Sequence, residues 1–204
     1  MVRVFGFGED ALTYHVLAHR LEELLDHLGD ASDPSSCVLL FRPSLGSGGR
    51  GRYHPGECDA ALITPRFTYL IESRWGGSKE LDEDELAPSQ ERRHRMIEWV
   101  AERWNGEQSS YDFYQDHNAA FRTEFKDREL VPAGSDVSNR LFWMLRKARS
   151  ISEDRVIRIK NVFLVIMEKG SNIRPISVPK GFVLLKMFYE PLDEARFFPM
   201  DGRP

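Results

Sequence analysis

Two acids and an arginine near the middle of the chain, Asp59, Glu72 and Arg74, have residue types and a spacing that suit metal-dependent phosphodiester chemistry. If the intervening segment folds back about Pro65 and Arg66, Asp59 lies directly opposite Glu72. Facing residues of an antiparallel pair have Cβ atoms roughly 5 Å apart, and like charges there are destabilising unless a cation lies between them. Arg74 follows Glu72 by two residues, so it belongs to the same strand face. The three side chains therefore predict a metal-dependent phosphodiesterase centre.

The segments on either side of the Pro-Arg pair have the composition of two β-strands. Residues 60–64 and 67–73 are apolar, aromatic or β-branched, and the pair between them interrupts the pattern. The same fold-back symmetry puts Ala61 opposite Leu70 and Ile63 opposite Thr68. Apolar residues occur on both faces of this hairpin, which is typical of strands in the middle of a sheet that is covered on both sides.

This arrangement resembles the PD-(D/E)xK nuclease superfamily, whose members have the restriction-endonuclease-like fold. In that family an Asp on one strand and Glu-x-Lys on the next bind a divalent ion and activate water against a DNA phosphodiester. Asp59 matches the first acid, Glu72 the second and Ser73 the intervening residue. The Gly-Glu-Cys-Asp run that ends at Asp59 is also similar to a Gly-Glu-x-Asp run in some members. One position departs from the pattern, because Arg74 stands where the family has lysine.

The resemblance implies a Mg²⁺-dependent DNA endonuclease, with Mn²⁺ as a substitute, that acts in restriction, defence or repair. Asp59, Glu72 and the backbone carbonyl of Ser73 are then the metal ligands. Gln90 is the glutamine that many members carry on the following helix. Arg74 can stabilise charge on the phosphate through a bidentate contact, but it stays protonated and cannot act as a general base. Cleavage of both DNA strands usually requires two active sites, which implies a homodimer.

Other residues can supplement or replace parts of this site. Some superfamily members take the cation from another element, for which Lys79 and Lys160 are the candidates here. An additional acid often comes from the first helix, where Glu9 or Asp10 is placed, although acids also favour a helix N-terminus for electrostatic reasons alone. The histidines show no ligand spacing such as His-Glu-x-x-His, so we expect them to be structural.

The elements that must position these side chains follow from hydrophobic periodicity. A helix at residues 88–104 has an apolar stripe that continues backwards through Gln90, Arg93 and His94. This predicts that Gln90 or Arg93 points towards the carboxylates. The whole pattern predicts an α/β fold with a central mixed sheet, a β-hairpin that carries the site, and helices on both faces. The other expected elements are helices at 10–28 and 136–149 and strands at 37–42, 156–167 and 182–189.

The length and composition favour one domain. A chain of 204 residues is long enough for one sizeable core, so we expect a single domain over residues 1–204 with a helical insertion at about 105–155. No apolar run approaches the roughly 20 residues that span a bilayer, and no secretory signal precedes the first helix. Cys37 and Cys58 both fall in expected strands and fit small buried residues better than a disulfide. These features predict a cytoplasmic protein with no membrane partner.

Three observations leave other functions open. The net charge of −4 argues against a nonspecific nucleic-acid coat protein, although local basic groups such as Arg50 and Arg52 can bind DNA. Arginine in the lysine position is also expected of a catalytically silent relative that uses the same fold to bind nucleic acid or a protein partner. Finally, the same charges are explained without catalysis if the chain is an unrelated interaction protein. Asp59, Glu72 and Arg74 are then simply an ion-paired rim of the hairpin.

Overall fold

The centre of the molecule is a mixed five-stranded sheet with the strand order β2-β3-β4-β5-β6. The computed structural model describes residues 5–44, 57–76, 86–126, 128–171, 176–190 and 197–200. Within the sheet the first three strands form an antiparallel meander, and the last two continue it in parallel with β4. The five strands are β2 (Val38–Phe41), β3 (Ala60–Ile63), β4 (Thr68–Trp75), β5 (Ile159–Glu168) and β6 (Phe182–Tyr189).

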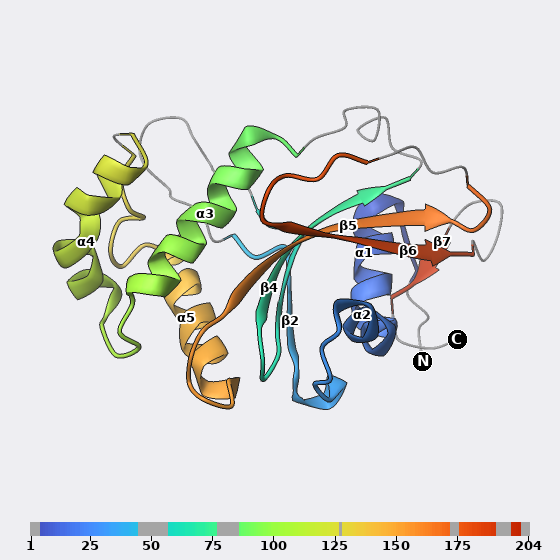
Figure 1. Cartoon of the computed structure of the whole chain (residues 1–204), viewed down its shortest axis with the longest axis horizontal. Coiled ribbons are helices and arrows are strands. Elements are labelled where there is room, and N and C mark those ends of the chain that lie inside the picture. The colour runs from blue at the N-terminus through green and yellow to red at the C-terminus, as the bar shows by residue number, and fades with distance from the viewer. Residues whose placement is uncertain are drawn as a thin grey trace.

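Helices cover both faces of this sheet (Figure 1). One face packs against the first two helices and the other against the remaining three. A short 3-10 helix, Pro34–Ser36, leads into β2. Within the described residues the α-helices are α1 (Gly8–His19), α2 (Leu21–Leu28), α3 (Pro88–Arg103), α4 (Ser110–Glu124) and α5 (Asp136–Ile151). This arrangement confirms the predicted α/β class with a mixed sheet flanked on both faces.

Alternation along the central hairpin decides which side chains meet which layer. Leu62 and Ile71 face α1 and α2, whereas Ala61 and Leu70 face α3 and its neighbours. All of these residues are buried because successive side chains of a strand point to opposite faces and both faces are covered. The hairpin therefore lies in the middle of the sheet, as its two-sided apolar composition predicts.

The register of the hairpin confirms the symmetry that the sequence suggests. Ala61 pairs with Leu70, and Ile63 pairs with Thr68. The turn is closed by a hydrogen bond from the Thr64 backbone N–H to the Phe67 carbonyl, at 2.8 Å. The pairing ends at Ala60 and Ile71, one residue short of the two acids. Asp59 and Glu72 are therefore the next facing positions at the open end of the hairpin.

The predicted helix at residues 10–28 is two helices rather than one. The backbone of Arg20 leaves the helical region with φ −124° and ψ 32°. Its guanidinium contacts the Glu23 carboxylate and the carbonyl of Phe188 on β6, so a contact distant in sequence holds the break. The second helix ends as predicted at Gly29, whose φ of 64° is a left-handed conformation that glycine adopts without strain.

Two further elements lie at the ends of the described chain. β1 (Phe5–Phe7) and β7 (Phe197–Pro199) pair as a separate antiparallel sheet next to α1. Phe198 is buried among the side chains of the α1 layer, so this part of the C-terminal segment is anchored by packing. The expected insertion at 105–155 contains α4 and all of α5. Among the described residues, none of the helices has both the length and the apolar character that crossing a membrane requires.

Candidate active site

Glu72 is the centre of a buried polar cluster between β4 and α3. Its side chain is 1% exposed, and it points to the face of the sheet that α3 covers. Gln90 Nε2 donates to Glu72 Oε2 at 2.9 Å, and Arg93 Nη1 donates to Oε1 at 3.2 Å. His94 Nε2 lies 3.0 Å from the same Oε1. The predicted approach of Gln90 and Arg93 to this carboxylate is thus present in the structure, and it includes His94 as well.

The spacing of these three residues explains why α3 supplies all of them. Positions 90, 93 and 94 are separated by three and four residues, so they lie on one face of a helix. The helix begins at Pro88, which is favourable in its first turn because proline lacks the N–H that is unpaired there. Gln90 Oε1 also accepts from the backbone N–H of Ala87 at 3.0 Å. The start of α3 is therefore fixed against Glu72.

His94 has a hydrogen-bond acceptor at each ring nitrogen. Nε2 faces the Glu72 carboxylate, and Nδ1 lies 2.8 Å from Asn161 Oδ1. Asn161 is oriented this way because its Nδ2 donates to Glu98 Oε1 at 2.7 Å. Burial by itself lowers the pKa of His94, but hydrogen bonds to Cys58 and Glu72 outweigh that effect and raise the pKa to about 10. Two acceptors and a raised pKa both indicate a charged imidazolium between Glu72 and Asn161 at neutral pH.

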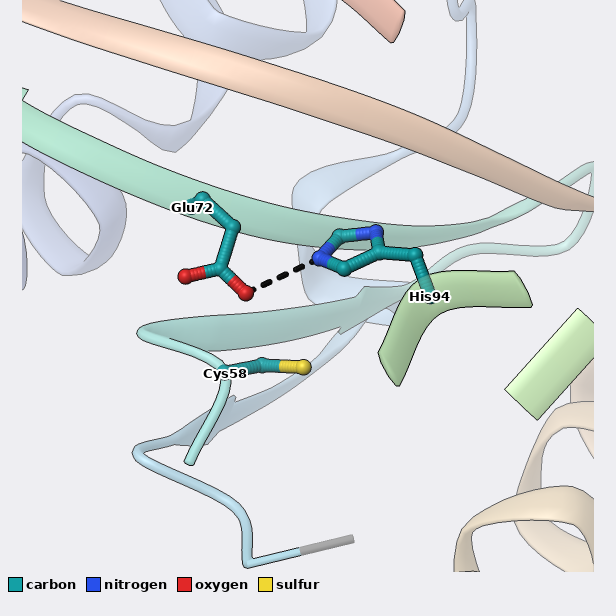
Figure 2. Close-up of side chains that lie close together, drawn as sticks. All are labelled: Cys58, Glu72 and His94. Carbon is teal, nitrogen blue, oxygen red and sulfur yellow. Dashed lines mark hydrogen bonds and ion pairs between the residues drawn. The ribbon is translucent and has the colours of Figure 1, made fainter. Parts of the chain in front are cut away.

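Cys58 belongs to the same cluster, a contact that the sequence analysis did not predict. Figure 2 shows its thiol beside the carboxylate of Glu72 and the imidazole of His94. One ligand atom from each of the three residues lies within 4.8 Å of the others, and all three residues are buried. His94, which we expected to be structural, thus lies beside two further possible metal ligands. The spacing from Gln90 to His94, one helical turn, is the signal that could have identified it.

Asp59 lies at the same end of the hairpin but has different partners. Its Oδ2 accepts from the Ser73 backbone N–H at 2.7 Å and from the Ser73 hydroxyl at 3.1 Å. Burial raises the pKa of the Asp59 carboxyl, and the negative charge of Glu72 raises it further, against the hydrogen bonds from Ser73 and the charge of Arg74. The two acids therefore interact electrostatically, as facing carboxylates should, and a cation near them is stabilising.

Arg74 is connected to both the backbone and the helix at this site. Nη1 donates to the Ser73 carbonyl at 2.8 Å, and Nη2 donates to Gln90 Oε1 at 3.0 Å. One amide side chain, that of Gln90, thus joins Arg74 to Glu72. Glu9 from α1 also reaches this strand end, where its Oε1 accepts from the Trp75 backbone N–H at 3.0 Å. The end of β4 that carries Arg74 is therefore connected to α3 through Gln90 and to α1 through Glu9.

Of the two other candidate cations, the one that the structure describes, Lys160, does not join this group. Lys160 Nζ lies 3.5 Å from the centre of the Phe67 ring, beside the turn of the hairpin and therefore at the opposite end of β4. Lys79 lies outside the described residues, as do Arg50 and Arg52. Arg74 is thus the cation that the described chain offers from the predicted strand, and Arg93 is a second one from α3.

The donor set at the predicted metal position fits a hard divalent ion. Asp59 and Glu72 offer carboxylate oxygens and Ser73 a carbonyl oxygen, which are the ligands that Mg²⁺ and Mn²⁺ prefer. The raised pKa of Asp59 supports this fit, because a dication would relieve the repulsion from Glu72. The Ser73 carbonyl accepts from Arg74 and Glu72 Oε2 accepts from Gln90, so an ion there would share these oxygens with the two donors or displace the donors.

No protein-family model, curated protein or solved structure shows a significant match to this chain. The class that the fold defines is an α/β protein with a mixed five-stranded sheet and a buried acidic site between β4 and α3.

Proposed function

We propose that the chain is a metal-dependent DNA endonuclease of the restriction-endonuclease-like kind, which hydrolyses phosphodiester bonds. The observation that carries the proposal is the bridge that Gln90 makes between Glu72 and Arg74. It brings the glutamate and the cation of the strand motif into contact with the glutamine of the next helix. Asp59 occupies the facing position at the same end of the hairpin. Asp59, Glu72, Arg74 and Gln90 thus lie at one end of the hairpin, although Arg74 replaces the lysine of the family pattern.

Each side chain has a distinct part in this proposal. Asp59, Glu72 and the Ser73 carbonyl hold the divalent ion, which lowers the pKa of a bound water and neutralises charge on the phosphate. Arg74 pairs with the phosphate oxygens and stabilises the charge that grows there. Gln90 sets the distance between Arg74 and Glu72. Proton removal from the attacking water does not depend on Arg74, because guanidinium stays protonated.

The cations of α3 have a supporting part. Arg93 and His94 bind Glu72 Oε1 and fix the carboxylate in one orientation. Arg93 Nε is buried and has no hydrogen-bond partner within the described segments. A buried donor of this kind is costly to leave unpaired, so a phosphate oxygen or a water near Glu72 would be stabilised by it.

One observation favours a second function, that of a catalytically silent relative which binds nucleic acid or a protein partner. Both oxygens of Glu72 already accept hydrogen bonds, and two of the three donors are cationic side chains at 3.0 and 3.2 Å. These contacts neutralise the charge that would otherwise attract a metal ion. A chain that has lost catalysis keeps such a cluster for its stability alone.

Cleavage of supercoiled plasmid in Mg²⁺ and in Mn²⁺ tests the proposal. Glu72→Gln should abolish nicking and linearisation, and Asp59→Asn should do the same while its amide oxygen still accepts from Ser73. Glu102→Gln is the matched control, because Glu102 is on α3 as well but is exposed at its far end. Circular dichroism should show that all variants are folded. Cleavage by Glu72→Gln at the wild-type rate would exclude the proposed site.

DNA binding separates the two functions if wild type does not cleave. A silent DNA-binding relative binds with an affinity that falls as salt rises, because phosphate contacts release counterions. It also keeps that affinity in Asp59→Asn. A protein that neither cleaves DNA nor binds it in a salt-sensitive way is not a nuclease and not a nucleic-acid-binding relative. Binding of a protein partner would then be the remaining interpretation. Sedimentation of the active form determines whether it acts as a homodimer.

A further inference from the structure

We propose that Cys58, Glu72 and His94 form a binding site for a thiophilic divalent ion such as Zn²⁺, separate in its chemistry from the magnesium site. The three residues come from three elements, namely the segment before β3, strand β4 and helix α3. An ion at this position would join all three elements in the interior. The inference does not depend on nuclease activity.

The distances between the three donors are close to those of a metal site. One ligand atom from each lies within 4.8 Å of the other two, and the Glu72 and His94 atoms are already 3.0 Å apart. Around a tetrahedral zinc ion, with bonds of about 2.0–2.3 Å, ligand atoms are roughly 3.5 Å apart. Figure 2 shows the thiol and the imidazole on the same side of the carboxylate. Small side-chain movements are therefore sufficient to enclose an ion.

The surroundings of His94 are those of a metal ligand. A histidine that binds metal through one nitrogen usually donates its other N–H to a carbonyl or carboxylate, which fixes the ring. Here Nδ1 meets the Asn161 amide oxygen at 2.8 Å, and Asn161 is itself held by Glu98 at 2.7 Å. Nε2 is thereby directed at Glu72 and Cys58. The arrangement leaves that nitrogen to the ion once its proton is displaced.

The charge balance of the cluster also permits a dication. An imidazolium, a thiol, the Glu72 carboxylate and the adjacent Arg93 guanidinium carry a total charge of about +1. Binding of M²⁺ displaces the proton on His94 Nε2 and the thiol proton of Cys58, because the ligands must be deprotonated. The total charge is the same afterwards. Burial of the ion next to Arg93 thus adds no net charge to the interior.

The ligand types select against magnesium. Thiolate and imidazole suit Zn²⁺, Co²⁺ and related ions, whereas Mg²⁺ demands oxygen ligands and keeps several of its waters. A site whose three residues are all buried has little room for such a hydrated ion. Glu72 therefore belongs to two candidate sites that suit chemically different ions. One is the cluster with Cys58 and His94, and the other consists of the oxygens of Asp59, Glu72 and Ser73.

Titration of the metal-free protein with Co²⁺ tests this site without DNA or activity. We expect one equivalent to bind and to produce a thiolate-to-cobalt charge-transfer absorption together with the strong visible bands of a tetrahedral ion. Zn²⁺ should displace the cobalt, and an excess of Mg²⁺ should not. Zn²⁺ should also raise the unfolding temperature, because an ion that binds only the folded state stabilises it.

Variants identify the ligands even if one of them folds poorly. The chain contains only two cysteines, so a charge-transfer band that persists in Cys37→Ser must come from Cys58. Cys58→Ala should lose the band, and Asn161→Ala should keep it but weaken cobalt binding by about 10–100-fold. A wild-type protein that gives no thiolate–cobalt absorption overturns the proposal. So does a band that disappears in Cys37→Ser.

Discussion

The carboxylate of Asp59 accepts a hydrogen bond from the backbone N–H of Ser73, with an Oδ2–N distance of 2.7 Å. The Ser73 hydroxyl donates to the same oxygen, so the hydroxyl of Thr13 on α1 must be the donor in its 2.9 Å contact with Ser73. Asp59 thus takes over the role of a backbone acceptor where β3 has ended. The hydrogen bond between Ser73 and Asp59 therefore fixes the Asp59 carboxylate of the candidate site and also pairs a backbone N–H of β4 beyond the end of β3.

Replacement of Asp59 should therefore affect stability as well as activity. Asp59→Ala removes the acceptor of the Ser73 N–H and should lower the free energy of unfolding by about 1–3 kcal/mol. Asp59→Asn retains an acceptor oxygen and should lower it less, although cleavage is lost in both. Urea unfolding monitored by circular dichroism measures the difference. Equal stability of Asp59→Ala and wild type would show that the contact with Ser73 contributes nothing.

Arg74 should tolerate lysine but not alanine. If the protein is an active nuclease, Arg74→Lys should retain or increase cleavage, because either cation can stabilise charge on the phosphoryl oxygens. Arg74→Ala should lower kcat about 10²-fold, which corresponds to roughly 3 kcal/mol, by analogy with the loss of one preorganised donor. Single-turnover plasmid cleavage provides the rates. Arg74→Ala that cleaves at the wild-type rate would mean that another cation, with Lys79 the next to test, acts in its place.

A second buried acid, away from the site, predicts how stability depends on pH. Asp30 accepts from Tyr69 at 2.9 Å, from Thr64 at 2.8 Å and from the backbone and hydroxyl of Ser32. Burial raises the pKa of Asp30, but these hydrogen bonds outweigh it and leave the pKa below its ordinary value. The ionised form is thus favoured in the folded state. Its contribution is complete above the unfolded pKa of about 3.9 and is lost as pH falls through the lower folded pKa.

Asp30→Asn is the matching variant for this pH effect. It should lower the free energy of unfolding at pH 7 by about 1.5–3 kcal/mol, the range for hydrogen bonds to a charged group. The difference between the variant and wild type should begin to shrink below about pH 4, where the unfolded carboxyl takes up a proton, and should be lost once pH falls below the lower folded pKa of Asp30. Urea unfolding at several pH values measures it. A difference that stays constant down to pH 2 would contradict the assignment.

Zinc should inhibit cleavage if both metal proposals are correct. The Glu72 carboxylate cannot fully ligate two ions at once, one with Cys58 and His94 and the other with Asp59. Increasing Zn²⁺ at constant Mg²⁺ should therefore slow plasmid cleavage. The Zn²⁺ dissociation constant derived from this inhibition should equal the one derived from the cobalt-displacement titration, once the competing ion is taken into account in each. The rate of each variant is compared with its own rate without zinc. Cys58→Ser should require a higher Zn²⁺ concentration than wild type for the same degree of inhibition. Unchanged cleavage at saturating Zn²⁺ would show that the two ions do not share Glu72.

The hairpin and the start of α3 could be predicted because local patterns determine them. The fold-back symmetry about Pro65 and Arg66 gives the observed register, since the period of two and a short turn leave little freedom. The contact between Gln90 and Glu72 follows from a helical stripe that borders the strand. Sequence positions close to one another, or related by a single turn, were sufficient for both inferences.

The remaining parts depend on contacts that no local pattern encodes. Cys58 meets His94 only because α3 packs across the hairpin, and Asn161 reaches His94 from a strand 67 positions along the chain. The break at Arg20 likewise depends on the Phe188 carbonyl of β6. The pairing of β1 with β7 joins the two ends of the described chain. Each of these features requires the completed fold.

The most direct test of the account is the position of manganese in crystals of the protein. An anomalous difference map from crystals soaked in millimolar Mn²⁺ should show one ion between the carboxylates of Asp59 and Glu72, with the Ser73 carbonyl as a further ligand. The peak should be absent from Asp59→Asn crystals grown in the same form. Binding of Mn²⁺ only elsewhere, or an empty position between the two acids in a protein that cleaves DNA, would contradict the proposed site.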